Sequence, residues 1–268
     1  MKIENISKEN LKDVFKVCSG ISMPSDPVLE KGRELKRQWL LDMLKRNGSC
    51  TKIAYLDEKP VVQMLFYPEE TLSYLHNPRK DVIYLKCIFN AFPEAQGKGV
   101  GATMLKTLID ECHTGLDCLG GGSCRFMVTQ PFPHEGGLSL GDFFSKYGFK
   151  QGNQELFLEI KDKYVPREIR EYRPLPEDRG KVIISYNIDC EWGLFFATKV
   201  RELIQGRYPD LPFETINNWE RPEEYKKRPY LSLIFGSVIV NAHEIKNPFL
   251  FWADQAAFLG CVEEALRK

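Results

Sequence analysis

The chain has 268 residues, of which 43% are hydrophobic and 28% are charged. This composition is typical of a globular protein and excludes the disordered and fibrous classes. Lysine and arginine together number 37, as do aspartate and glutamate, so no overall positive field attracts a nucleic acid or an anionic membrane surface. We therefore expect neither as a partner, and any anion must be bound by a local arrangement of the chain.

No apolar run approaches the roughly 20 residues of a membrane-spanning helix, and the first residues lack the apolar segment of a signal peptide. The expected location is the cytoplasm, where the eight cysteines would be reduced thiols. They include no Cys-x-x-Cys pair, and the even spacing of Cys112, Cys118 and Cys124 matches no common zinc-site pattern. We expect small core side chains at these positions and no bound metal.

The first 160 residues read as strands interleaved with helices. Helices are expected where apolar residues recur every three or four positions, and strands where short apolar runs end at turn residues. The expected order is a strand at 1–6, helices at 8–18 and 26–46, strands at 51–56, 61–67 and 82–90, a helix at 103–112, a strand at 124–130, a helix at 139–146 and a strand at 155–161. The strands at 51–56 and 61–67 form an antiparallel hairpin.

A charged segment that carries three prolines, at 163–180, has the composition of an interdomain connector. Beyond it we expect strands at 181–186, 211–216, 231–235 and 237–240, and helices at 194–205 and 252–267. This order does not repeat that of the first half. The sequence therefore predicts two different α/β domains, at 1–162 and 181–268.

A glycine-rich segment lies between the strand at 82–90 and the helix that follows it. Its glycines let the backbone curl so that successive N–H groups point outward, and the helix adds the positive end of its dipole. Because glycine has no side chain, a diphosphate can approach the main chain closely, and a lysine adds a flexible positive charge. The segment is an expected anion cradle made of Gln96, Gly97, Lys98, Gly99, Val100 and Gly101.

Several nucleotide-binding loops fit that description. A Walker loop would need Gly-Lys-Ser/Thr, which is absent, and a dinucleotide fingerprint would need a different glycine spacing inside a parallel β-α-β unit. The arrangement instead resembles the Gln/Arg-x-x-Gly-x-Gly/Ala signature of the GNAT acetyltransferases, carried here by Gln96, Gly99 and Gly101. Downstream, residues 143–149 are similar to the family's aromatic-x-x-x-x-Gly-Phe segment. A plain strand-to-helix turn at 97–101 is the alternative interpretation.

The resemblance implies a GNAT acyl-CoA N-acyltransferase fold of the α/β (α+β) class with a mixed, mostly antiparallel sheet. It implies acetyl-CoA or coenzyme A as co-substrate, with the pantetheine arm between the splayed strands at 82–90 and 124–130. The main chain of Phe89, Asn90 and Ala91 would bond to the pantetheine amides. A backbone N–H near a strand bulge would polarise the acyl carbonyl, and an amine would attack it directly, without an acyl-enzyme.

Acid–base candidates are few in this sequence. In many relatives a tyrosine four residues before the glycine of the Gly-Phe pair donates a proton to the leaving thiolate, but here that position is Phe144, which cannot donate. Tyr147 is adjacent to the glycine and is expected to face elsewhere. His134, whose charge state changes near neutral pH, and Glu94 are the candidate catalytic residues. The alternative is that both are solvated surface groups.

The second half resembles a thioredoxin-like domain, with Cys190 just before a helix and Pro229 where that fold has its cis-proline. Chains that join such an extension to a GNAT domain form the YoaP-like group, which this sequence resembles throughout. Where an oxidoreductase has Cys-x-x-Cys, this chain has Cys190-x-x-Gly193, so no local disulfide forms. The helix terminus favours a thiolate, whereas Asp189 and Glu191 oppose it. A reactive thiol and a structural cysteine both remain open.

The expected function is an N-acetyltransferase that moves an acetyl (acyl) group from acetyl-CoA to a primary amine of a small molecule or peptide. A non-catalytic acyl-CoA-binding or sensing protein is the rival from another class, because Phe144 replaces the usual acid. A thiol-dependent role through Cys190 is the third hypothesis.

Overall fold

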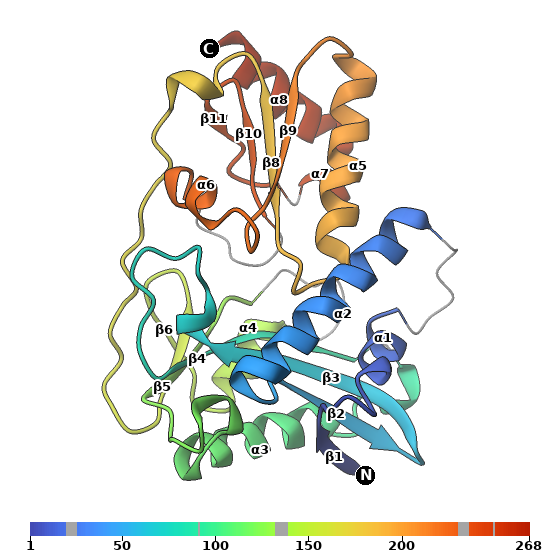
Figure 1. Cartoon of the computed structure of the whole chain (residues 1–268), viewed down its shortest axis with the longest axis vertical. Coiled ribbons are helices and arrows are strands. Elements are labelled where there is room, and N and C mark those ends of the chain that lie inside the picture. The colour runs from blue at the N-terminus through green and yellow to red at the C-terminus, as the bar shows by residue number, and fades with distance from the viewer. Residues whose placement is uncertain (20–25, 91, 132–138, 230–235, 249) are drawn as a thin grey trace. The chain divides into compact units, whose positions relative to one another are not determined.

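The computed structural model describes residues 1–19, 26–90, 92–131, 139–229, 236–248 and 250–268. The chain forms two compact units (Figure 1). The first comprises Met1–Ser25, Arg37–Leu72 and Asn77–Glu168, and the second comprises Asp26–Lys36, Ser73–His76 and Ile169–Lys268. The two units are therefore interleaved in sequence.

The first unit is built on a mixed, mostly antiparallel sheet, as the sequence predicts. The described residues contribute seven strands in the order β1-β2-β3-β4-β5-β7-β6. Only β4 and β5 pair in parallel, and every other neighbouring pair is antiparallel. The strands are β1 (Lys2–Asn5), β2 (Thr51–Leu56), β3 (Lys59–Pro68), β4 (Val82–Phe89), β5 (Phe126–Thr129), β6 (Lys150–Gln151) and β7 (Leu156–Glu159).

Helix α3 (Val100–Thr114) packs against this sheet through an apolar stripe. Met104, Leu105, Leu108 and Cys112 are all fully buried, and their spacing of three and four residues places them on one face of the helix. The other helical segments of the described residues up to 168 are α1 (Lys12–Cys18), α2 (Pro27–Asn47), α4 (Leu140–Ser145) and the 3-10 turns η1 (Glu69–Thr71), η2 (Pro93–Ala95) and η3 (Asp117–Leu119). The stripe holds α3 on the sheet and so fixes the position of its N-terminus.

The second unit has a four-stranded sheet among its described residues, in the order β11-β10-β8-β9. The β8–β9 pair is parallel, and the β8–β10 and β10–β11 pairs are antiparallel. The elements are η4 (Pro176–Asp178), β8 (Val182–Tyr186), α5 (Trp192–Arg207), β9 (Phe213–Asn217), α6 (Pro222–Lys227), β10 (Val238–Val240), β11 (His243–Glu244), α7 (Leu250–Ala253) and α8 (Gln255–Arg267).

The core of the second unit lies between α5, α8 and one face of that sheet. Alternate residues of β8, Val182 and Ile184, join Phe196 of α5 and Phe258 of α8 in one buried cluster, whereas Ile183 belongs to a smaller cluster that contains none of these residues. This alternation is the two-residue period of a strand covered on both faces. Figure 1 shows α5 running alongside the sheet of this unit.

Three local features of the second unit differ from the sequence-based expectations. The expected helix at 252–267 is broken at Asp254, whose extended backbone and side-chain bond to the Ala257 N–H, at 2.9 Å, make it the N-cap of α8. Helix α6 was not expected. Strand β10 forms a hairpin with β11 through a turn at Asn241 and Ala242, which both have a positive φ. The strand that was expected to form a hairpin with β10, at 231–235, lies outside the described residues.

None of the helices in the described ranges combines the length and the apolar character that crossing a membrane requires.

Candidate functional site

The glycine-rich segment forms a tight, exposed turn between η2 and α3. Gly97 has a φ of 70° and Gly99 a φ of 74°, the left-handed region in which a side chain is strained. A Cβ added at either glycine would meet nothing within 4 Å. The backbone conformation, and not packing, therefore favours glycine here, and the space beside both residues is open.

The N–H groups around this turn point away from internal acceptors. Gly99 is the N-cap of α3 and has no side chain that could accept from the first helical turn. The first hydrogen bond of the helix runs from Thr103 N to Gly99 O at 2.9 Å. Among the described residues, none accepts a hydrogen bond of normal geometry from the N–H groups of residues 97–102. Such a group of donors at a helix N-terminus is suited to binding an anion.

Strands β4 and β5 pair over a short stretch and then separate. Their parallel register begins at Val82 with Phe126 and ends at Tyr84 with Val128, although β4 continues to Phe89. The register between β3 and β4 also shifts near its middle, which is the mark of a β-bulge. The second half of β4 therefore lies beyond the stretch that pairs with β5.

The end of β4 and the glycine turn lie side by side. A Cβ on Gly101, in the first turn of α3, would be 3.4 Å from Cδ1 of Ile88 in β4. Phe89 closes the strand, and the Asn90 side chain holds the following turn by accepting a hydrogen bond from Phe92 N at 3.1 Å. Ala91 lies outside the described residues.

The other residues of the expected cradle differ in exposure. Gln96 and Lys98 are exposed, whereas Val100 is buried as the first residue of the apolar face of α3. The buried valine anchors the turn, and the exposed pair leaves its outer side accessible. The polar side chains are thus placed to approach a bound anion from solvent, and the apolar one is not.

Of the two candidate catalytic residues, the structure describes only Glu94. His134 lies outside the described residues. Glu94, in η2, forms an ion pair with Lys59, and the hydrogen bond from that lysine lowers the pKa of the glutamate. A carboxylate with a lowered pKa is a weaker base towards an ammonium group.

Phe144 is buried in the short helix α4 with 2% of its surface exposed. Its ring packs at a centroid distance of 5.2 Å from Phe149 and 5.3 Å from Phe143. Tyr147 is half-buried, and its ring lies 5.9 Å from the Lys106 ammonium of α3. The residue at the expected position of the acid is therefore a core phenylalanine, and the ring of the nearby Tyr147 lies beside α3.

In the second unit, half-buried Cys190 lies two residues before α5. Its neighbours Asp189 and Glu191 are fully buried. Gly193 has no room for a side chain, because an added Cβ would lie 2.2 Å from the carbonyl oxygen of Asn187. The glycine of the Cys190-x-x-Gly193 sequence is thus a packing requirement, and a second cysteine cannot occupy that position unless the backbone moves.

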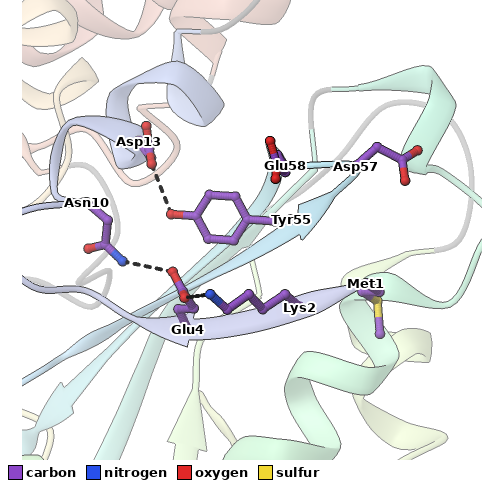
Figure 2. Close-up of a pocket in the computed structure, with 8 residues that line it drawn as sticks. All are labelled: Met1, Lys2, Glu4, Asn10, Asp13, Tyr55, Asp57 and Glu58. Atoms are coloured by element: carbon purple, nitrogen blue, oxygen red, sulfur yellow. Dashed lines mark hydrogen bonds and ion pairs between the residues drawn. The ribbon is translucent and has the colours of Figure 1, made fainter.

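An open pocket of about 530 Å³ lies elsewhere in the first unit, at the sheet edge where β1, the turn before α1 and the β2–β3 turn meet (Figure 2). The Tyr55 hydroxyl donates to Asp13 at 3.0 Å, and burial, followed by that carboxylate, raises the pKa of the phenol. The pocket is lined by Met1, Lys2, Glu4, Asn10, Asp13, Tyr55, Asp57 and Glu58. Sequence reasoning singled out none of them, because they come from three segments that share no motif.

Three of the charged groups that line this pocket form ion pairs. Lys2 pairs with Glu4, and Lys16 reaches Asp13 at 2.7 Å. Figure 2 shows these carboxylates turned towards Tyr55 and Asn10. A local network of this kind explains the geometry of the pocket, and we assign no ligand to it.

No family model and no curated protein matches the chain. Solved structures resemble about 60% of it. A GNAT family acetyltransferase from Brucella melitensis in complex with acetyl-CoA is 16% identical, with 62% of this chain and 92% of that chain covered and a TM-score of 0.42. The ribosomal-protein-S18-alanine N-acetyltransferase from Escherichia coli is 12% identical (61% and 96% covered, TM-score 0.39).

A third structure, the PaiA N-acetyltransferase from Thermoplasma acidophilum in complex with coenzyme A, is 18% identical, with 61% of this chain and 98% of that chain covered and a TM-score of 0.39. Likeness at this level carries no argument by itself. The described residues form the mixed, mostly antiparallel sheet that the sequence predicts, and the four-stranded sheet belongs to an additional α/β unit.

Proposed function

We propose that the protein is an N-acetyltransferase that moves an acetyl or other acyl group from its coenzyme A thioester to a primary amine. The observation that carries this proposal is the turn at 97–101, where two left-handed glycines with open space beside them precede a helix N-terminus. Unpaired N–H groups of this kind bind a diphosphate without any basic patch, and the chain has no net charge to supply one.

The rest of the coenzyme would lie along the second half of β4, beyond its pairing with β5. Main-chain groups of Phe89, Asn90 and Ala91 are the proposed partners of the pantetheine amides. The short β4–β5 pairing supports this placement because it ends at Tyr84, five residues before the end of β4 at Phe89. Gln96 and Lys98 would supplement the cradle from the solvent side.

The reaction would proceed by direct attack. The amine nitrogen forms a bond to the thioester carbonyl carbon, the C–S bond breaks, and coenzyme A leaves as a thiolate that takes up a proton. A backbone N–H near the β4 bulge stabilises the negative charge on the carbonyl oxygen. His134 is the proposed base or acid, with Glu94 as the lesser candidate because of its ion pair with Lys59.

The second unit is the proposed thioredoxin-like extension of a YoaP-like protein. Its strand order, with a parallel β8–β9 pair followed by antiparallel β10 and β11, supports this assignment. No peptide bond among the described residues is cis, so the bond before Pro229 is trans, unlike the cis-proline of that fold. Domains at 1–162 and 181–268, joined by a linker at 163–180, and a cytoplasmic location complete the proposal.

A non-catalytic acyl-CoA-binding or sensing protein is the second candidate function. The buried ring of Phe144, which cannot protonate a thiolate, is the observation that favours it. A thiol-dependent role through half-buried Cys190 is kept as a third.

Two measurements separate these functions. Isothermal titration calorimetry with coenzyme A and acetyl-CoA tests the cradle, and the absence of binding heat would reject both coenzyme A hypotheses. Release of coenzyme A, followed without added thiols across polyamines, amino acids, aminoglycosides and peptides with a free amine, tests catalysis. Binding without release for any amine would favour the sensor.

The role of His134 is tested separately with His134→Ala. If the imidazole moves the proton, turnover falls about 10²-fold or more, as for loss of a general base, while the affinity for coenzyme A stays within twofold. Unchanged turnover would remove His134 from the mechanism.

A further inference from the structure

Four of the eight cysteines gather in one buried cluster of the first unit, which the proposed function does not use. They come from the residue before β2, the last turn of α3, η3 and the segment before β5. Each has at most 4% of its surface exposed, and the members are Cys50, Cys112, Cys118 and Cys124.

Cys112 and Cys124 face each other across adjacent backbones. The N–H of Cys124 donates to the carbonyl oxygen of Cys112 at 2.9 Å, which brings the two Cα atoms into the range that a disulfide spans. The Cys124 thiol donates to the carbonyl oxygen of Phe126 at 3.0 Å. Both cysteine side chains are fully buried beside this backbone contact.

Cys50 and Cys118 form a second pair, although 68 positions separate them in sequence. The preceding residues hold them together: Ser49 N donates to the Asp117 carboxylate at 2.8 Å. Both cysteine side chains are buried, and Cys118 is the first cause of the raised pKa of the Cys50 thiol. This pair links η3 to the residue before β2, and the other pair links the two ends of the connection between α3 and β5.

We propose that this cluster is a modification site: two dithiols that close into Cys50–Cys118 and Cys112–Cys124 disulfides by exchange with a low-molecular-weight disulfide such as oxidised glutathione. Each bridge forms when one thiolate displaces a glutathione thiolate and the second then displaces the other. Two cysteine thiols are oxidised, one glutathione disulfide is reduced to two glutathione molecules, and the two protons pass to them.

The surroundings of the cluster make the exchange slow and the product durable. The hydrogen bond to the neighbouring thiol, with burial second, raises the pKa of both Cys50 and Cys112, so thiolates are scarce in the closed structure. Exchange therefore requires transient opening of the segment between α3 and β5. Once formed, a buried disulfide is protected from reduction in the same way.

A metal site is the competing use of four such thiols. In the described residues, no three histidine, cysteine or acidic side chains are arranged to hold a metal ion. Hydrogen bonds instead bring Cys112 next to Cys124, and the residues before Cys50 and Cys118 next to each other. The geometry thus favours bridges over a tetrathiolate centre.

The experiment equilibrates the full chain with glutathione buffers of increasing disulfide fraction, a few degrees below its unfolding midpoint. After alkylation with N-ethylmaleimide under denaturing conditions, non-reducing peptide mass spectrometry should find the 50–118 and 112–124 links. The midpoint of the oxidised chain should lie at least about 5 °C above that of the reduced chain, because both bridges restrict the unfolded state.

Cys118→Ser should lose only the 50–118 link and Cys124→Ser only the 112–124 link, whereas the control Cys261→Ser should keep both. Four alkylated thiols at these positions in the most oxidising buffer, or indiscriminate pairing with the other cysteines, would overturn the proposal for the wild-type chain whether or not the variants fold. Release of a stoichiometric metal ion from the purified chain by a mercurial would overturn it as well.

Discussion

Replacing Gly99 by alanine isolates the contribution of the glycine turn to coenzyme A binding. The residue has a φ of 74°, and an added Cβ would meet no described atom within 4 Å. Alanine therefore strains the backbone by about 1–2 kcal/mol and places a methyl group in the space that the diphosphate would occupy. Gly120 is a matched control, because it has a φ of 62°, equally open surroundings and a position at the end of η3, away from the cradle.

The two variants should lose similar stability but differ in binding. A hydrogen bond to a charged group contributes about 1.5–3 kcal/mol, so loss of one N–H contact to a phosphate weakens binding roughly 10- to 150-fold. Calorimetric titration should show that loss for Gly99→Ala and a dissociation constant within twofold of wild type for Gly120→Ala. If both variants bind coenzyme A like the wild type, or if both weaken equally, the turn is not the diphosphate site.

Two stability predictions concern the second unit. Gly193→Ala places a Cβ 2.2 Å from the carbonyl oxygen of Asn187 and should lower the free energy of unfolding by about 2 kcal/mol. Gly206→Ala, in the same helix, meets no atom within 4 Å and should raise the free energy of unfolding by up to about 1 kcal/mol. Equal urea midpoints for the two variants would contradict the steric clash predicted at position 193. Glu224 accepts a hydrogen bond from Lys227 at 2.9 Å, which is the largest cause that lowers its pKa to about 2. Because the folded pKa lies below the unfolded one, this stabilisation is complete above about pH 4.5 and is lost as the pH falls towards 2. For a carboxylate that keeps 26% of its side chain exposed, we expect about 1 kcal/mol after solvent screening. Urea titrations should show a gap in unfolding free energy between wild type and Glu224→Gln that closes over that range, and a gap that stays constant would refute the prediction.

The conformation of the glycine turn was predictable because its determinants are local. Gln96 to Gly101 occupy consecutive positions, and the conformations that glycine permits are properties of the residue itself. The apolar stripe of α3 is also local, since Met104, Leu105 and Leu108 repeat with the helical period. The mixed, mostly antiparallel character of the sheet followed from the resemblance, not from periodicity.

Features that depend on distant parts of the chain were not predictable. At Asp254 the apolar pattern favours a continuous helix, but the aspartate side chain caps a new helix instead, and the helix breaks there. The contact of Cys50 with Cys118 arises only when the sheet and η3 meet, and the spacing of cysteines along the chain carries no sign of it. The collision that keeps position 193 a glycine likewise comes from the backbone of Asn187.

Peptide N–H groups do not titrate, unlike the histidine or lysine side chains that line many phosphate sites. A cradle built from them presents the same donors in mildly acidic and mildly alkaline solution. The affinity for coenzyme A should then follow only the ionisation of its own phosphates and the integrity of the fold. Any pH dependence of turnover would consequently report on the acceptor amine and its base, which makes pH–rate profiles an unusually direct view of the chemical step.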